Sequence, residues 1–142
     1  MSTVFTRVIN GEIPGRFVWK DERCVGFLSI GPMAPGHTLV VPREEVDVWT
    51  DADPDLLQHL ITVAQNIGAV MPKTFNAVRA GLMIAGYEIP HLHLHVWPSS
   101  SLEDFDLDKV DNNPEPAEMD QAAEKLRAAL VGAGHQEFVP EA

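Results

Sequence analysis

The stretch His91-Leu92-His93-Leu94-His95-Val96-Trp97 has a histidine at every second position of an otherwise apolar run. Successive side chains of a β-strand point to opposite faces. The spacing therefore predicts a strand with three imidazoles on one face and apolar side chains entering the core from the other. Along such a strand neighbouring histidines would be roughly 6.5 Å apart, close enough to share one phosphate group or one hydrogen-bond network. We expect the functional site at these three histidines.

Two kinds of chemistry fit a row of histidines. The ordinary pKa of imidazole lies near neutrality, so such a row can supply a neutral nucleophile beside protonated neighbours that face an anion. Alternatively, His-x-His on a strand, completed by His37 or Glu88, is a typical arrangement of zinc or iron ligands. The spacing alone leaves both chemistries open.

Hydrophobic patterns elsewhere predict an α+β fold with an antiparallel sheet of about five strands. The β-prone segments are residues 16–20, 24–30, 37–41, 74–85 and 91–97. Connections of hairpin length, such as Asp21-Glu22 and the tight connection at 86–90, favour antiparallel pairing. The third of these segments begins with His37, which brings a fourth histidine to the sheet.

Helical periodicity predicts a main helix and a C-terminal helix, after a short helix or turn at 5–9. The main helix begins at Asp53-Pro54, an N-cap followed by a first-turn proline, and is expected to end at Pro72. Its His59 lies on a polar face, where a solvated side chain is expected. The C-terminal helix is predicted from near Pro116 to Gly132–Gly134.

The length of 142 residues fits one domain over residues 1–142. Apolar runs are well short of the ~20 residues that span a bilayer, and the first residues do not resemble a secretory signal. We therefore expect a cytoplasmic protein with no membrane partner. The single cysteine, Cys24, permits neither an intramolecular disulfide nor a paired-cysteine zinc site.

The net charge of −11 is unevenly distributed, because residues 101–142 carry 11 acids against 3 bases. An acidic chain without a cluster of Lys and Arg argues against a nucleic-acid polymer as partner, since that affinity comes largely from phosphate neutralisation. A mononucleotide is not excluded, because backbone N–H groups and a few histidines can hold a small anion. Residues 101–142 are expected to form an acidic, helical C-terminal extension.

The histidine row and several upstream segments resemble landmarks of the histidine triad (HIT) family, in the family's order. Residues 91–97 are similar to its signature, His-φ-His-φ-His-φ-φ with φ apolar. The other matching segments are Gly11-Glu12-Ile13-Pro14, Phe27-Leu28-Ser29-Ile30, Ala34-Pro35-Gly36-His37-Thr38-Leu39-Val40-Val41-Pro42 and Ala85-Gly86. The resemblance covers about residues 4–98.

The resemblance implies a HIT-like fold that cleaves nucleoside phosphoramidates or dinucleoside polyphosphates at the α-phosphorus. His93 would be the nucleophile and form a nucleotidyl-histidine intermediate, and His95 would donate a hydrogen bond to the phosphoryl oxygen. His91 and His37 would orient the other imidazoles. The family's usual homodimer would use residues 74–85 or the adjoining helix, and neither a cofactor nor a metal is implied.

The same resemblance assigns nucleotide binding to Phe27, Ser29, Ile30, Gly86 and Glu88, with Phe5 and Val8 as further candidates for the base pocket. Several of these positions depart from the family pattern. Ser29 stands where the family often has an Asp that accepts hydrogen bonds from the ribose, and Glu88 stands where a small hydroxyl residue often helps bind phosphate. Ala80 and Tyr87 replace a usual Asn and Gln. These departures leave a nucleotide-binding module with little turnover, or a His-ligated metallohydrolase, as alternatives to an enzyme that acts through His93.

Overall fold

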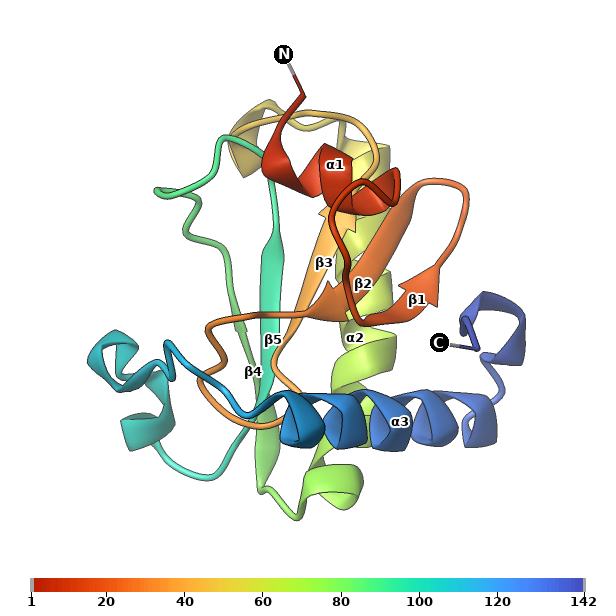
Figure 1. Ribbon diagram of the computed structural model, residues 1–142. Helices are drawn as coiled ribbons and strands as arrows, with labels where there is room; N and C mark the ends of the chain where they lie inside the picture. Colours follow the sequence, from red (N-terminus) through yellow and green to blue (C-terminus); the bar gives the residue numbers. More distant parts are fainter. Residues whose placement is uncertain (1, 142) are drawn as a thin grey trace.

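The computed structural model describes residues 2–141. Five strands in this part of the chain form one antiparallel sheet in the order β1-β2-β3-β5-β4 (Figure 1). The strands are β1 (Phe17–Lys20), β2 (Cys24–Leu28), β3 (Thr38–Pro42), β4 (Arg79–Met83) and β5 (Leu94–Ser99). The first three follow one another as neighbours, whereas β5 lies between β3 and β4. The predicted α+β fold with an antiparallel sheet is confirmed.

The helices are α1 (Val4–Ile9), α2 (Pro54–Phe75) and α3 (Pro116–Gly132), with short 3₁₀ helices η1 (Trp49–Asp51), η2 (Leu102–Phe105), η3 (Leu107–Lys109) and η4 (Gln136–Phe138). Asp53 caps α2 by accepting from the backbone N–H of Asp55, as expected. The prediction that Pro72 ends this helix is wrong, because α2 continues to Phe75. A proline in the last turn removes a single intrahelical bond, and the helix ends where Asn76 takes a left-handed φ of 53°.

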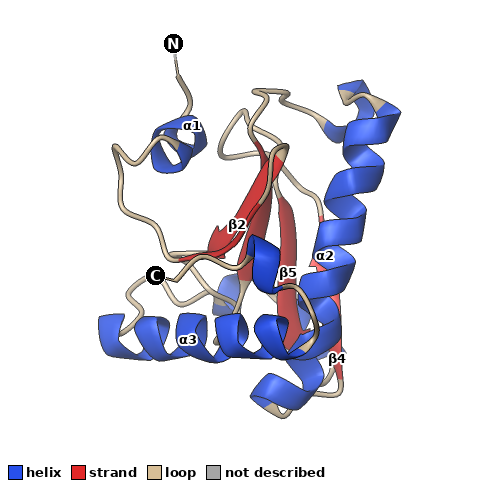
Figure 2. Cartoon of the chain, turned by 90° about the vertical axis from the view of Figure 1, so that its right-hand side faces the viewer, coloured by secondary structure: helices blue, strands red, loops and turns tan. Residues whose placement is uncertain are grey.

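The sheet separates two hydrophobic clusters. On one face it packs against α2 and α3, and on the other against the short α1 (Figures 1 and 2). Alternation along β3 shows how one strand serves both clusters, since Val40 belongs to the first and its neighbours Leu39 and Val41 to the second. α1 contributes Phe5 and Val8 to the second cluster.

The C-terminal segment is part of this architecture. α3 runs across the lower end of the molecule, crosswise to α2 (Figures 1 and 2). The four apolar residues whose spacing predicts this helix, Met119, Ala122, Leu126 and Leu130, are buried, and so is Ala123. Beyond α3, Phe138 stacks on Trp19 with ring centroids 5.0 Å apart. In the described part of the chain no helix is long and apolar enough to cross a membrane.

The histidine row lies only partly on a strand, which corrects the expectation for residues 91–97. β5 begins at Leu94, so His91 and His93 precede it. Pro42, the last residue of β3, has no N–H to continue the ladder, and the backbone N–H of Leu92 donates instead to the carbonyl of Val46 at 2.7 Å. The predicted alternation persists, because Leu92, Leu94 and Val96 are all buried in the cluster beneath α2.

Candidate active site

His93 is oriented by the backbone of its own row. Its Nδ1 lies 2.7 Å from the carbonyl oxygen of His91. A carbonyl can only accept, so Nδ1 carries the proton and the lone pair of a neutral ring is on Nε2. The His93 residue is 7% exposed. The arrangement fixes the tautomer that leaves Nε2 free to act as a nucleophile.

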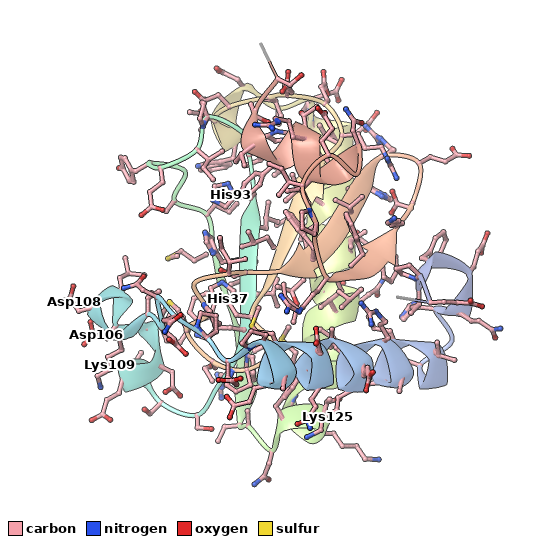
Figure 3. The ribbon with its side chains drawn as sticks, in the orientation of Figure 1. His37, His93, Asp106, Asp108, Lys109 and Lys125 are labelled. Atoms are coloured by element: carbon pink, nitrogen blue, oxygen red, sulfur yellow. The ribbon has the colours of Figure 1, made fainter. Side chains whose placement is uncertain are left out.

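A second chain of hydrogen bonds orients His95 through His37. The backbone N–H of Met33 donates to His37 Nδ1 at 3.0 Å, so the proton of the neutral His37 ring is on Nε2. That atom lies 3.0 Å from His95 Nδ1, which accepts. The proton of a neutral His95 is therefore on its Nε2, where it can be donated to a substrate. Figure 3 shows His93 toward the α1 end of the site and His37 toward its lower end.

Burial keeps these rings neutral. It lowers the pKa of His37 to about 3, with smaller contributions from His95 and His93, and the pKa of His95 to about 4, with a smaller contribution from His93. The pKa of His93 also falls below its ordinary value, chiefly through burial. The hydrogen bonds above require neutral rings at His37 and His95, because each accepts at Nδ1, so the electrostatics and the geometry agree for these two residues.

The fully buried His91 ties the row to α1 and β3. Its Nε2 donates to the carbonyl of Pro42 at 2.8 Å, and its Nδ1 lies 2.6 Å from Thr3 Oγ1, which donates to it. Thr3 is also the N-cap of α1, because the same oxygen accepts from the backbone N–H of Thr6. One hydroxyl group thus links the start of α1 to the residue whose carbonyl holds His93.

The exposed side chain of Glu45 also contacts the start of α1. One of its carboxylate oxygens accepts from the backbone N–H of Thr3 and from Thr6 Oγ1, both at 2.7 Å. Thr3, Met33 and Pro42 also position the site, and none of them was predicted from the sequence. Thr3 carries the pattern of a helix cap, but nothing in the sequence connects it with a histidine 88 positions later.

The residues that the resemblance assigns to nucleotide binding differ in their contact with the histidine row and in their exposure to solvent. Phe5 meets His93 edge-on with ring centroids 4.9 Å apart, and Phe27 packs edge-on against Phe5 on the same cluster. Ser29 is buried and its Oγ accepts from the backbone N–H of Gly31. Ile30, in contrast, is 81% exposed.

The loop before the row carries the remaining two assigned residues. Gly86 has a φ of +81°, a conformation that other residues adopt at a cost. Glu88 is exposed and close enough for its charge to raise the pKa of His93, although this effect is smaller than that of burial. Val8, like Phe5, is buried in the cluster under α1.

An acidic segment after β5 borders the same site. The backbone N–H of Asp111 donates to the carbonyl of Pro32 at 3.0 Å, so residues 101–111 pack on the loop that orients His37. Trp97 lies between His37 and Phe105, at centroid distances of 5.5 and 4.8 Å. Figure 3 shows Asp106, Asp108 and Lys109 on this segment. The predicted C-terminal extension therefore adjoins the site, a contact that its sequence did not indicate.

Among the residues that the structure describes, the histidine row with His37 and Glu88 does not bring three metal-ligating atoms within 4.8 Å of one another. In residues 2–141, three such atoms from different His, Cys, Asp or Glu residues lie within 4.8 Å of one another at a single place, formed by Asp21, Cys24 and His59. The expectation that His59 is simply solvated is wrong, because its Nε2 lies 2.8 Å from Asp21 Oδ2.

An antiparallel sheet that presents three histidines in an alternating row, with a fourth histidine from the neighbouring loop beside them, is the arrangement typical of the histidine triad class. Sequence comparison agrees, since the model of the HIT domain matches residues 10–102. The chain belongs to the HIT family.

Relatives and solved structures support this membership. The chain is 32% identical to an uncharacterized HIT-like protein of Methanocaldococcus jannaschii over 121 residues, which cover 75% of this chain and 94% of that protein. A Zn-bound histidine triad family protein from Mycobacterium smegmatis is 28% identical and superposes with a TM-score of 0.81, covering 96% of this chain and 98% of the other. A HIT family hydrolase from Legionella pneumophila is 25% identical with a TM-score of 0.61, over 71% of this chain and 96% of that one.

Proposed function

We propose that the protein is a nucleotide-phosphate hydrolase or transferase that attacks the α-phosphorus of a nucleoside phosphoramidate or dinucleoside polyphosphate through His93. The observation that carries this proposal is the pair of hydrogen-bond chains that leaves a lone pair on His93 Nε2 and a proton on His95 Nε2. A nucleophile and an adjacent donor are the two groups that substitution at phosphorus requires.

The reaction proceeds in two displacements. The lone pair of His93 Nε2 forms a bond to phosphorus while the bond to the leaving group breaks, and the leaving group takes the electron pair and a proton from solvent. The attacking His93 ring becomes cationic, and its Nδ1–H bond to the carbonyl of His91 becomes charge-assisted. Water then attacks phosphorus and loses a proton to solvent, and the electron pair of the P–N bond returns to His93.

The nucleotide lies against α1 and the loops around the row in this proposal. Phe27 and Phe5 support the base with Ile30 at the rim, and Ser29 replaces the usual ribose-binding carboxylate with one weaker contact. Gly86 lets its backbone approach the phosphate, and Glu88 acts on the leaving group or on water. His95 stabilises the charge on the phosphoryl oxygen.

The functional unit in this proposal is a homodimer joined along β4. This strand is the edge of the sheet next to β5, and its Leu82 and the preceding Val78 are 49% and 66% exposed. Unpaired backbone groups and exposed apolar side chains on an edge strand favour pairing with a second copy.

Turnover of adenosine 5′-phosphoramidate tests the proposed function. We expect wild-type protein to release AMP in the presence of chelator, and His93→Gly to lose at least a thousandfold in kcat because the nucleophile is gone. His135→Gln, which changes a histidine beyond α3, is the matched control and should keep wild-type turnover. Equal rates for His93→Gly and wild type would overturn the proposal.

A further inference from the structure

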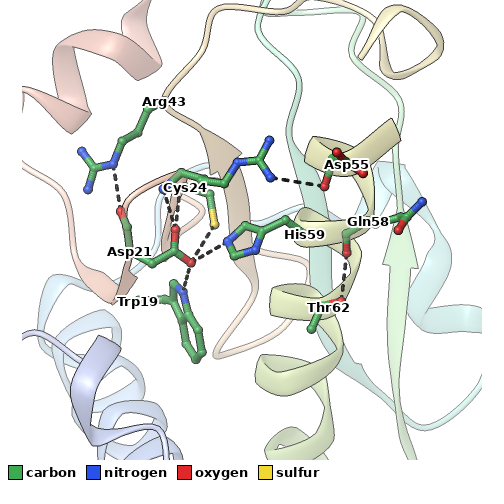
Figure 4. A network of polar contacts seen from close by, with 9 residues as sticks. Trp19, Asp21, Cys24, Arg43, Asp55, Gln58, His59 and Thr62 are labelled. Carbon is green, nitrogen blue, oxygen red and sulfur yellow. Dashed lines mark hydrogen bonds and ion pairs between the residues drawn. The ribbon is translucent and has the colours of Figure 1, made fainter. Parts of the chain in front are cut away.

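Two metal-ligating side chains from the hairpin of β1 and β2 meet a third from α2, away from the histidine row (Figure 4). Asp21 Oδ2 lies 2.8 Å from His59 Nε2 and 3.5 Å from Cys24 Sγ. All three ligand atoms lie within 4.8 Å of one another. Asp21 and Cys24 come from the hairpin and His59 from the helix, so the cluster joins two elements that are far apart in sequence.

Burial differs across the cluster, and one of its sides is open to solvent. Cys24 is fully buried, the Asp21 side chain is 8% exposed and the His59 side chain 32%. The open side meets a cavity of about 970 Å³, whose lining includes Asp21, His59, Trp19, Asn66 and His135. An ion can enter from this cavity, and a water molecule can occupy a coordination position that the protein leaves open.

The hydrogen bonds of Asp21 show which atoms are available. Its Oδ1 accepts from the backbone N–H groups of Arg23 and Cys24 and so holds the turn. Its Oδ2 accepts from Trp19 Nε1, from His59 and from the Cys24 thiol. The last two donors would themselves become ligands, so an ion that replaces their protons leaves no buried group without a partner.

The distances also agree with tetrahedral coordination. Zinc–sulfur and zinc–oxygen bonds of roughly 2.3 and 2.0 Å give a sulfur–oxygen edge of about 3.5 Å, which is the Cys24–Asp21 distance. The corresponding nitrogen–oxygen edge is about 3.3 Å, so His59 has to move by about half an ångström from its 2.8 Å contact.

We propose that Asp21 Oδ2, Cys24 Sγ and His59 Nε2 form a binding site for a borderline-soft divalent ion of the Zn²⁺ class, with water from the cavity as fourth ligand. Thiolate, imidazole and carboxylate together select such an ion over Mg²⁺ or Ca²⁺. Binding transfers the thiol proton to solvent, and the proton of His59 moves to Nδ1. The negative charges of Asp21 and the thiolate then neutralise the dication.

Binding of Zn²⁺ and Co²⁺ to the full chain, freed of metal by chelator, tests this site. We expect one ion per chain, and for Co²⁺ a thiolate-to-metal charge-transfer band together with the absorption of a tetrahedral complex. His59→Gln and Cys24→Ser should each weaken Zn²⁺ binding at least tenfold, and Cys24→Ser should abolish the charge-transfer band. Because His59 lies on a half-exposed helix face, His59→Gln keeps the test valid if the buried Cys24→Ser fails to fold.

His135→Gln and His93→Gly are the matched controls, because they remove a histidine from the cavity wall outside the cluster and from the catalytic row. Both should bind Zn²⁺ as wild type does. The proposal is overturned if Co²⁺ shows no thiolate band, if Zn²⁺ binding is unchanged in His59→Gln, or if it is lost in His93→Gly.

Discussion

Replacing Thr3 by valine should show how far the active site depends on α1. Valine has nearly the shape of threonine but no hydroxyl group. The substitution therefore removes the donor that lies 2.6 Å from His91 Nδ1 and the acceptor that caps α1. The fully buried His91 is left with an unpaired ring nitrogen.

The expected loss of stability follows from these two contacts. A buried acceptor without a partner costs about 1–3 kcal/mol, and loss of a threonine N-cap costs about 1 kcal/mol. The free energy of unfolding should therefore fall by about 2–4 kcal/mol. The carbonyl of His91 orients His93, so looser anchoring of His91 should also reduce kcat, by about tenfold if 1.4 kcal/mol of transition-state stabilisation is lost.

Urea denaturation and steady-state turnover of adenosine 5′-phosphoramidate measure both effects. Thr3→Ser, which keeps the hydroxyl group, should restore them. Thr6→Val is the matched control, because it removes an exposed hydrogen bond to Glu45 and leaves the His91 contact in place. If Thr3→Val and Thr6→Val lose the same free energy of unfolding and keep the same kcat, the link through Thr3 has no such role.

Three further predictions address acidity, specificity and assembly. The pKa of His37 is about 3 in the folded protein and ordinarily about 6.5. The contribution of His37 to the free energy of unfolding is therefore constant above pH 6.5 and falls as the pH drops, by about 3 kcal/mol at pH 4.5. Urea denaturation of His37→Gln should show a correspondingly shallower dependence on pH. An equal dependence in wild type and His37→Gln would contradict this prediction. Ser29→Asp should lower KM for nucleoside phosphoramidates by restoring a carboxylate for the ribose, whereas an unchanged KM would place Ser29 outside the ribose site. Leu82→Lys should shift a dimer to monomer in sedimentation velocity, and a monomeric wild type would contradict assembly through β4.

Period-two alternation was sufficient to predict much of the fold. Leu92, Leu94 and Val96 enter the core as predicted, and the histidines occupy the other side. The extent of the strand was not predictable in the same way, because it depends on Pro42 of β3, which cannot extend the ladder toward His91. The tertiary pairing partner, rather than the local pattern, decided where β5 begins.

The contacts that orient the site lie between segments far apart in the chain. Thr3 and His91 are 88 positions apart, and His37 and His95 are 58 apart. No local periodicity encodes such pairs. The same limit applies to Asp21 and His59, whose individual positions look like a turn residue and a polar helix residue, and whose proximity depends on how α2 crosses the sheet.

In the proposed mechanism, His93 Nε2 forms a covalent bond to phosphorus. Acid-free quenching of wild-type protein during turnover of adenosine 5′-phosphoramidate, followed by intact-mass and peptide mass spectrometry, tests it most directly. We expect a transient adduct with the mass of an adenylyl group on the peptide that contains His93, absent from His93→Gly. Turnover with AMP release but no adduct at any quench time, or an adduct on another residue, would contradict the account.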